Sequence, residues 1–336
     1  MTRLENAWAD LERDGEISEF AGDVLARRVP TGAACSLFIG VGQPARERQL
    51  RLEVPSSAVP RDLQLPDAEG FDLDIEYDGQ KQAATIIVRC SSASNHELFA
   101  LFAESLVRAA GLARESRECI DALIQRIEVW RRFFRGDAGM LSADGRAGLV
   151  GELLILRDVM LPALGISGAV GAWTAGEGTQ QDFACSQATV EVKSTRGRLP
   201  GVIRVSSERQ LDPSTCGRLF LAVVFLHVTA DGGISLPELV ADIRNTVQLE
   251  ASDALGGLDD RLAGRGYTDL HADSYQRDRY TVREIKVYSV EQHFPSVREK
   301  SLPTGVGDVT YALALAACEP YVRHINELKS ALEEQN

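Results

Sequence analysis

The chain has 336 residues, of which 44% are hydrophobic and 25% are charged, and its formal net charge at pH 7 is −13. This length is enough for two domains, and the composition is ordinary for a soluble globular protein. The negative charge argues against a surface coated with positive charge for non-specific DNA binding, but it leaves room for a local basic groove.

The first part of the chain predicts a small α+β domain over residues 1–112. The first 30 or so residues favour a helix, because Leu4, Trp8 and Leu11 recur at helical spacing. Four strands and a second helix should follow, at residues 35–42, 48–55, 71–78, 82–90 and 95–112. In the third strand, hydrophobic and acidic residues alternate strictly, which is typical of a half-buried antiparallel strand. Its acidic face argues against DNA contact, so we expect this domain to bind other proteins.

Residues 113–136 predict a helical connector. Arginines alternate there with Trp130, Phe133 and Phe134, and an amphipathic bridging helix explains this pattern better than a nucleic-acid contact does. Glycine and small polar residues then mark a boundary. The second domain should therefore comprise residues 137–336.

The second domain mixes helices with strands, which predicts an α/β core with a mixed sheet. Helices are expected at about 145–164, 235–247 and 250–264 and at the C-terminus. The second of these opens with a capping box from Ser235 to Glu238. Strands are expected near residues 181–186, 188–194, 201–206, 218–226, 280–290 and 309–317. The strand at 218–226 is apolar throughout, so both of its faces should be buried.

The sequence lacks the motifs that would indicate several other functions. The six cysteines and five histidines are scattered singly, so neither a zinc site nor a disulfide scaffold is indicated. The glycine pair at 40–42 is followed by a strand and not by a helix, so it is a hairpin turn and not a dinucleotide-binding loop. The first residues lack the apolar core of a signal peptide, and no run approaches the ~18 apolar residues that span a bilayer. We therefore expect a cytoplasmic protein with no membrane contact.

The stretch QQDFACSQATVEVKST, residues 180–195, carries a candidate metal site. Residues two apart on a strand share a face, so Glu191 and Lys193 should project together into a cleft while the neighbouring valines enter the core. Asp182 lies one hairpin upstream and could return beside Glu191. Two carboxylates placed together repel each other unless a divalent cation or a proton lies between them. Mg²⁺ suits this arrangement, because it needs only one or two carboxylates.

The (D/E)-x-K pattern occurs three times in the chain, and its surroundings separate the copies. The copy at 327–329 falls in a helix, where residues two apart do not share a face. The copy at 284–286 is on a strand, but in a charged stretch. Only the copy at 191–193 follows a helix with a carboxylate, Glu152, beside its apolar stripe, where a charge is costly unless it is paired or metal-linked. A polar strand-to-helix junction that includes Gln210 comes after it.

Taken in order, these blocks resemble the PD-(D/E)XK nuclease superfamily. The segments GLVGELLILRD, QDF, VEVKST, VSSERQL and HFPSV…LPTGVGDVTYALAL are similar to one uncharacterised prokaryotic family of PD-(D/E)XK proteins, found among restriction and phage-defence genes. The similarity covers most of the chain, although Gln181 stands where the superfamily motif has proline. It implies a restriction-endonuclease-like fold, in which helices flank a mixed sheet.

The resemblance also implies roles for the residues of the site. Asp182, Glu191 and the backbone carbonyl of Val192 would hold Mg²⁺ or Mn²⁺, and Glu152 would bind the metal through water or orient the site. Lys193 would position a water molecule for attack on a phosphodiester.

The basic segment after the hairpin would then lie beside the DNA strand. Gln210, with Ser207, would contact the DNA backbone or support Lys193. Phosphate contacts would come from Arg196, Arg198, Arg204 and Arg209. Without the resemblance, a solvated loop explains these arginines equally well.

We therefore expect a Mg²⁺-dependent DNA endonuclease of a restriction or anti-phage defence system, acting with other proteins. A homodimer or a larger complex is compatible with this function, because double-strand cutting usually needs two active sites. One alternative is a non-catalytic DNA- or protein-binding subunit built on a nuclease fold. The other is an unrelated α/β domain on which the three charged groups are surface residues.

Overall fold

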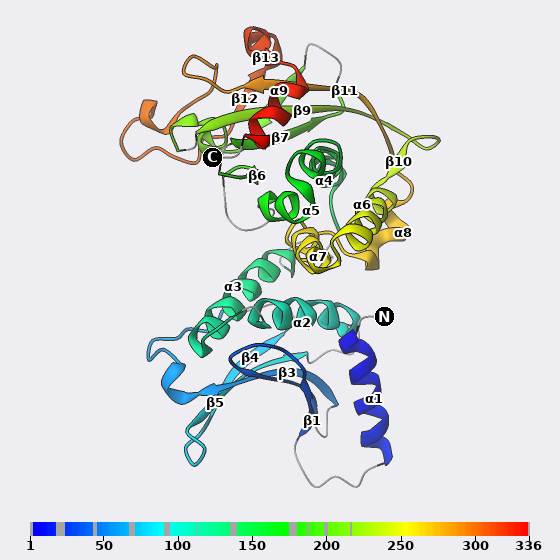
Figure 1. The fold of residues 1–336 in the computed structure, drawn as a ribbon, viewed down its shortest axis with the longest axis vertical. Helices are drawn as coiled ribbons and strands as arrows, with labels where there is room; N and C mark the ends of the chain where they lie inside the picture. The colour runs from blue at the N-terminus through cyan, green and yellow to red at the C-terminus, as the bar shows by residue number, and fades with distance from the viewer. Residues whose placement is uncertain are drawn as a thin grey trace. The chain divides into compact units, whose positions relative to one another are not determined.

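The structure is a computed structural model that describes residues 3–17, 24–42, 46–66, 71–90, 95–111, 113–134, 140–174, 180–186, 188–197, 201–215 and 217–334. The chain forms two compact units, Met1–Gly139 and Met140–Asn336 (Figure 1). The segment expected to be a connector contains helix α3 (Ser116–Phe134). This helix packs on α2 (His96–Gly111) and buries an apolar stripe there, so it is part of the first unit.

The first unit contains a five-stranded antiparallel sheet in the order β1-β2-β3-β5-β4. Its strands are β1 (Val24–Val29), β2 (Ser36–Gly42), β3 (Glu47–Pro55), β4 (Asp72–Asp78) and β5 (Ala83–Cys90). Helix α1 (Arg3–Ile17) and α2 bury aromatic residues against one face, with the rings of Trp8 and Phe99 5.3 Å apart. The prediction of a helix through residue 30 was wrong, because β1 pairs with β2 along its whole length and gains its backbone hydrogen bonds there.

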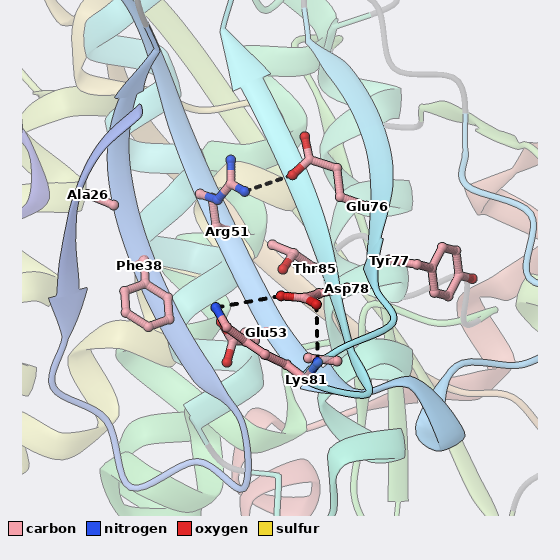
Figure 2. Close-up of a pocket in the computed structure, with 10 residues that line it drawn as sticks. Ala26, Phe38, Arg51, Glu53, Glu76, Tyr77, Asp78, Lys81 and Thr85 are labelled. Carbon is pink, nitrogen blue, oxygen red and sulfur yellow. Dashed lines mark hydrogen bonds and ion pairs between the residues drawn. The ribbon is translucent and has the colours of Figure 1, made fainter. Parts of the chain in front are cut away.

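Two acidic residues of β4 form ion pairs with arginines on β5, the adjacent strand, and on β3, the strand beyond it. Arg51 donates to Glu76 at 2.9 Å, and Arg89 donates to Asp74 at 3.3 Å. Figure 2 shows Arg51 directed at Glu76 on the open face of the sheet, beside a hollow of about 350 Å³. The alternation in the sequence thus reflects cross-strand ion pairs on a solvent-facing surface.

The second unit has an α/β fold with a mixed sheet, as predicted. The sheet order is β10-β11-β9-β7-β6, with β13 also on β11. Only the β7–β9 pair is parallel among its described strand pairs. The strands are β6 (Phe183–Ala184), β7 (Ala188–Thr195), β9 (Arg218–Thr229), β10 (Ile234–Ser235), β11 (Arg279–Ser289) and β13 (Val322–Arg323). A separate ribbon joins β8 (Val202–Val205) to β12 (Tyr311–Ala314).

Most helices of the second unit lie at the predicted positions. The helices are α4 (Ala143–Ile155), α5 (Leu161–Ala172), α6 (Leu236–Glu250), α7 (Leu255–Gly264), α8 (Ala272–Tyr275) and α9 (Ile325–Glu333). Helix α5 continues beyond residue 164, and α8 was not predicted. A π-helical turn (Leu156–Met160) joins α4 to α5. The capping box of α6 is confirmed: Ser235 accepts from the backbone N–H of Glu238, and the Glu238 carboxylate accepts from that of Ser235.

The run Ala143–Ala172 corrects one expectation about apolar segments. Within the described residues it is a helix long and apolar enough, by length and composition, to cross a membrane. Residues of α4 such as Val150, Leu153 and Ile155 are fully buried in the core beside β7 and β9. Core packing therefore accounts for the apolar composition of this helix.

Candidate functional site

The site is built on the hairpin of β6 and β7. Phe183 pairs with Val190 and Ala184 with Thr189, so the same register sets Asp182 opposite Glu191. The backbone N–H of Val192 donates to Asp182 Oδ2 at 2.8 Å, which fixes one side of that carboxylate. The hairpin spacing in the sequence thus corresponds to real proximity of the two acidic residues.

Glu191 is fully buried, which contradicts the expectation that it projects into an open cleft. Strand β7 lies between β6 and β9, and the short helix η5 (Glu208–Leu211) covers the face that carries Glu191. Neither carboxylate oxygen has a hydrogen bond of ordinary geometry within the residues that the structure describes. Burial, and then the nearby Asp182, raise the pKa of Glu191 well above its usual range.

Lys193 is the positive charge that faces Glu191. Its Nζ lies 2.7 Å from Glu191 Oε1 and donates to Gln210 Oε1 at 3.0 Å. Gln210 Oε1 also accepts from the backbone N–H of Ser206 at 2.9 Å. The amide of Gln210 is therefore held by the backbone and in turn holds the ammonium group in position.

Glu152 reaches the site from α4 and is almost fully buried. Trp173 Nε1 donates to its Oε2 at 3.0 Å, and Arg265 Nε donates to the same oxygen at 2.7 Å. The preceding residue is Gly151, where a Cβ atom would overlap the hydroxyl of Ser194 on β7. Glycine at this position therefore lets α4 bring Glu152 close to the hairpin.

Arg265 is a residue of the site that the sequence did not reveal. It follows the C-terminus of α7, and its Nη2 contacts Glu152 Oε1 and lies 2.8 Å from Asp182 Oδ1. Burial lowers the pKa of Arg265 to about 10. In sequence it stands between two glycines, 83 residues from Asp182 and 113 from Glu152, so no local pattern connects it to its partners.

The residues present fit a divalent cation between Asp182 and Glu191. Apart from the ion pair with Lys193, the buried Glu191 oxygens have no hydrogen bond of ordinary geometry in the described part of the chain. Burial also raises the pKa of Asp182 to about 6, and a bound cation or a proton would stabilise both carboxylates. The N–H and C=O of one strand residue point the same way, so the Val192 carbonyl faces the side of Asp182. In the described chain, no group of three or more His, Cys, Asp or Glu side chains is suited to metal. Glu152 is held instead by Arg265 and Trp173.

The residues predicted to bind phosphate differ in their exposure and in their ion pairs. Arg196 pairs with Asp144, and Arg209 lies 3.4 Å from Glu299, so both are partly neutralised. Arg204 is exposed on β8, and Ser207 caps η5 by accepting from the backbone N–H of Arg209 at 3.3 Å. Arg198 lies outside the described residues.

The other copies of the (D/E)-x-K pattern are structurally different. On β11, Glu284 is exposed and Lys286 pairs with Glu319 at 2.7 Å. Asp278, the carboxylate upstream, is bound by Arg146 at 2.6 Å. The copy at 327–329 lies in α9, where Glu327 completes the helix cap. Only the copy on β7 combines burial, a facing aspartate and unsatisfied carboxylate oxygens among the described residues.

Residues 4–316 match the family described as "Putative PD-(D/E)XK family member, (DUF4420)". Searches among curated proteins and among solved structures found no match. The family match covers most of both compact units and includes the complete β6–β7 hairpin. The chain therefore belongs to the DUF4420 family of PD-(D/E)XK proteins.

Proposed function

We propose that this protein is a metal-dependent DNA endonuclease. The observation that carries the proposal is the buried Glu191 carboxylate, whose oxygens lack hydrogen bonds in the described chain, opposite Asp182 and beside Lys193. A buried carboxylate pair is costly without a cation or shared proton. Membership of the PD-(D/E)XK family supports nuclease chemistry as the reason for this arrangement.

Mg²⁺ or Mn²⁺ would be held by Asp182, Glu191 and the carbonyl of Val192. When bound, such an ion stabilises the charge that develops on a phosphodiester and activates water. Asp182 and Glu191 are preorganised for it, because the hairpin register places them opposite each other before any ion arrives. The Val192 N–H orients Asp182 by a hydrogen bond that needs no water.

Lys193 would orient the attacking water and stabilise the phosphate charge. Its three N–H groups allow one contact to Glu191, one to Gln210 and one to water or phosphate. Gln210 fixes the direction of that third donor, since its own oxygen is tied to the Ser206 backbone. We infer that Gln210 supports Lys193 and does not bind DNA itself.

DNA would lie beside β8 and η5, where Arg204, Arg209 and Ser207 follow the catalytic hairpin. We further propose a role in a restriction or anti-phage defence system, in the cytoplasm and with partner proteins, as the sequence resemblance implies. Two active sites are usually needed to cut both strands, which supports a homodimer or a larger complex.

A second candidate function is supported by Arg265. Its guanidinium already pairs with Glu152 and Asp182, so fewer carboxylate oxygens remain to bind a cation. A non-catalytic subunit that binds DNA or protein on a nuclease fold would also tolerate this arrangement.

The test is cleavage of supercoiled plasmid DNA with Mg²⁺ or Mn²⁺ and with EDTA. We expect metal-dependent nicking that is lost in Glu191→Gln and Lys193→Ala. The matched controls are Glu284→Gln and Lys286→Ala, which change the same pattern on β11 and should retain activity. If Glu191→Gln and Lys193→Ala cut like the parent, the proposal is wrong. Inactivity of the pure chain together with inactivity in a reconstituted complex would favour the non-catalytic subunit.

A further inference from the structure

Arg265 occupies a position between two buried acidic side chains. Its Nε donates to Glu152 Oε2 at 2.7 Å, and its Nη2 donates to Asp182 Oδ1 at 2.8 Å. The side chains of Glu152 and Asp182 are 5% and 13% exposed, so both carboxylates are largely removed from water. One planar cation thus bridges two acidic groups from distant parts of the chain.

The contacts of Arg265 leave acceptor directions of Asp182 and Glu191 available to a cation. Asp182 Oδ1 is used by Arg265 and Oδ2 by the Val192 N–H, while the Glu191 oxygens face Lys193 and have no hydrogen bond of ordinary geometry among the described residues. Each carboxylate oxygen has two acceptor directions, so Asp182 retains one on each oxygen. A cation can therefore bind on the Glu191 side of Asp182 without removing Arg265 from the Glu152 side.

The charges of the group favour a single added ion. With every group ionised, the three carboxylates and the two cations Lys193 and Arg265 carry a formal charge of −1. One divalent ion changes this to +1, which attracts a phosphodiester. A second ion would give +3 in a buried site, where unbalanced charge is costly.

We propose that Arg265 takes the place of a second metal ion, so that the site binds one divalent cation, between Asp182 and Glu191. The guanidinium neutralises Glu152 and the adjacent oxygen of Asp182, and it remains there when the ion binds. Unlike a metal it has no open coordination position, so its contribution is fixed charge and N–H donors. This inference rests on the proposed cation at Asp182 and Glu191, and it adds the number of ions and the role of Arg265.

The experiment counts Mn²⁺ ions per chain, by calorimetric titration and by the spin-resonance signal of free Mn²⁺, in the absence of DNA. We expect one ion in the wild type, absent in Glu191→Gln, and two ions in Arg265→Gln. The matched control is Arg244→Gln. Arg244 also bridges two carboxylates, pairing with Asp259 and Asp269 at 2.8 Å, but those acidic side chains are 36% and 55% exposed. Its removal should leave the count at one.

The outcomes separate this inference from the proposed function. Two ions in the wild type, or one ion in a folded Arg265→Gln, would overturn the role of Arg265 while leaving a metal site in place. No Glu191-dependent ion in the wild type would overturn the metal site itself, and this inference with it.

A second variant covers the case in which Arg265→Gln does not fold. Glu152→Gln should still bind one ion with an affinity within about threefold of wild type, because Arg265 and not the ion holds Glu152. Loss of a residue that directly supports a metal ligand typically weakens binding by roughly 10–100-fold. A loss of that size in Glu152→Gln would show that the ion, and not Arg265, is the partner of Glu152.

Discussion

The contact between α4 and β7 at Gly151 gives a sharp test of how the site is assembled. A methyl group at Gly151 would overlap Ser194 Oγ, and it would lie 3.3 Å from Ser194 Cβ and 3.7 Å from Val192 Cγ1. Ser194 Oγ is buried and has no hydrogen-bond partner in the described chain. Gly151→Ala must therefore rotate Ser194 or push α4 away from β7, and the latter moves Glu152 out of position.

Two opposing effects set the change in the free energy of unfolding that Gly151→Ala causes. Overpacking a core costs about 1–3 kcal/mol, and alanine is better than glycine in a helix by up to about 1 kcal/mol. Gly151→Ala should therefore lower the free energy of unfolding by about 1–2 kcal/mol in the wild type. In a Ser194→Ala background the overlap is absent, so the same change should be neutral or stabilising by up to about 1 kcal/mol.

Urea unfolding of the four proteins measures this coupling, and hydrogen exchange of α4 and β7 peptides reports the second unit separately. We expect a coupling energy of about 1–3 kcal/mol between Gly151 and Ser194, in the range seen for residues in contact. An equal effect of Gly151→Ala in both backgrounds would refute the close approach of the helix to the strand.

Three further predictions follow from the same contacts. Burial raises the pKa of Asp182 to about 6 and also raises that of Glu191, so protons compete with the metal ion for these carboxylates. The affinity for Mn²⁺ should therefore rise as the pH rises from 5.5 to 8, and an affinity that does not change with pH would contradict this. The raised pKa of Asp182 also makes the stability of the metal-free fold depend on pH: the protonated carboxyl group contributes stability below about pH 4, and this contribution is lost as the pH rises through 6. The melting temperature of the metal-free protein should therefore fall over that interval, and it should fall less in Asp182→Asn. Trp173→Phe removes a buried hydrogen bond to the Glu152 carboxylate and should cost roughly 1.5–3 kcal/mol by urea unfolding.

The hairpin of the site was predictable because its information is local. Alternation in VEVKS fixes which side chains share a face, and the short distance to Asp182 fits a two-stranded turn. The same reasoning located the mixed sheet and the capping box of α6. These features depend on residues within about a dozen positions of one another.

The burial of Glu191 and the role of Arg265 were not predictable in this way. Glu191 is covered because η5 and the β8–β12 ribbon, which are formed by later segments, close over the polar face of β7. Arg265 meets its partners through the packing of α7, and its flanking glycines indicate only the end of a helix. The strand β1 was missed for a related reason, since its pairing with β2 decides its structure more than its own side chains do.

The copies of (D/E)-x-K on β7 and β11 show why the motif alone is ambiguous. On β11 the lysine pairs with Glu319 and the glutamate of the motif faces solvent, so neither charge requires a bound ion to balance it. On β7 the lysine faces a buried glutamate, and a second carboxylate, Asp182, lies opposite. Arg265 pairs with Asp182 and with Glu152. Protein contacts thus neutralise all but one unit of negative charge, and the remaining charge is buried. A fold that only needed stability could replace the buried Glu191–Lys193 pair with well-packed apolar side chains at little or no cost. The presence of this pair where β6 faces β7 is the physical argument for the cation site that we propose.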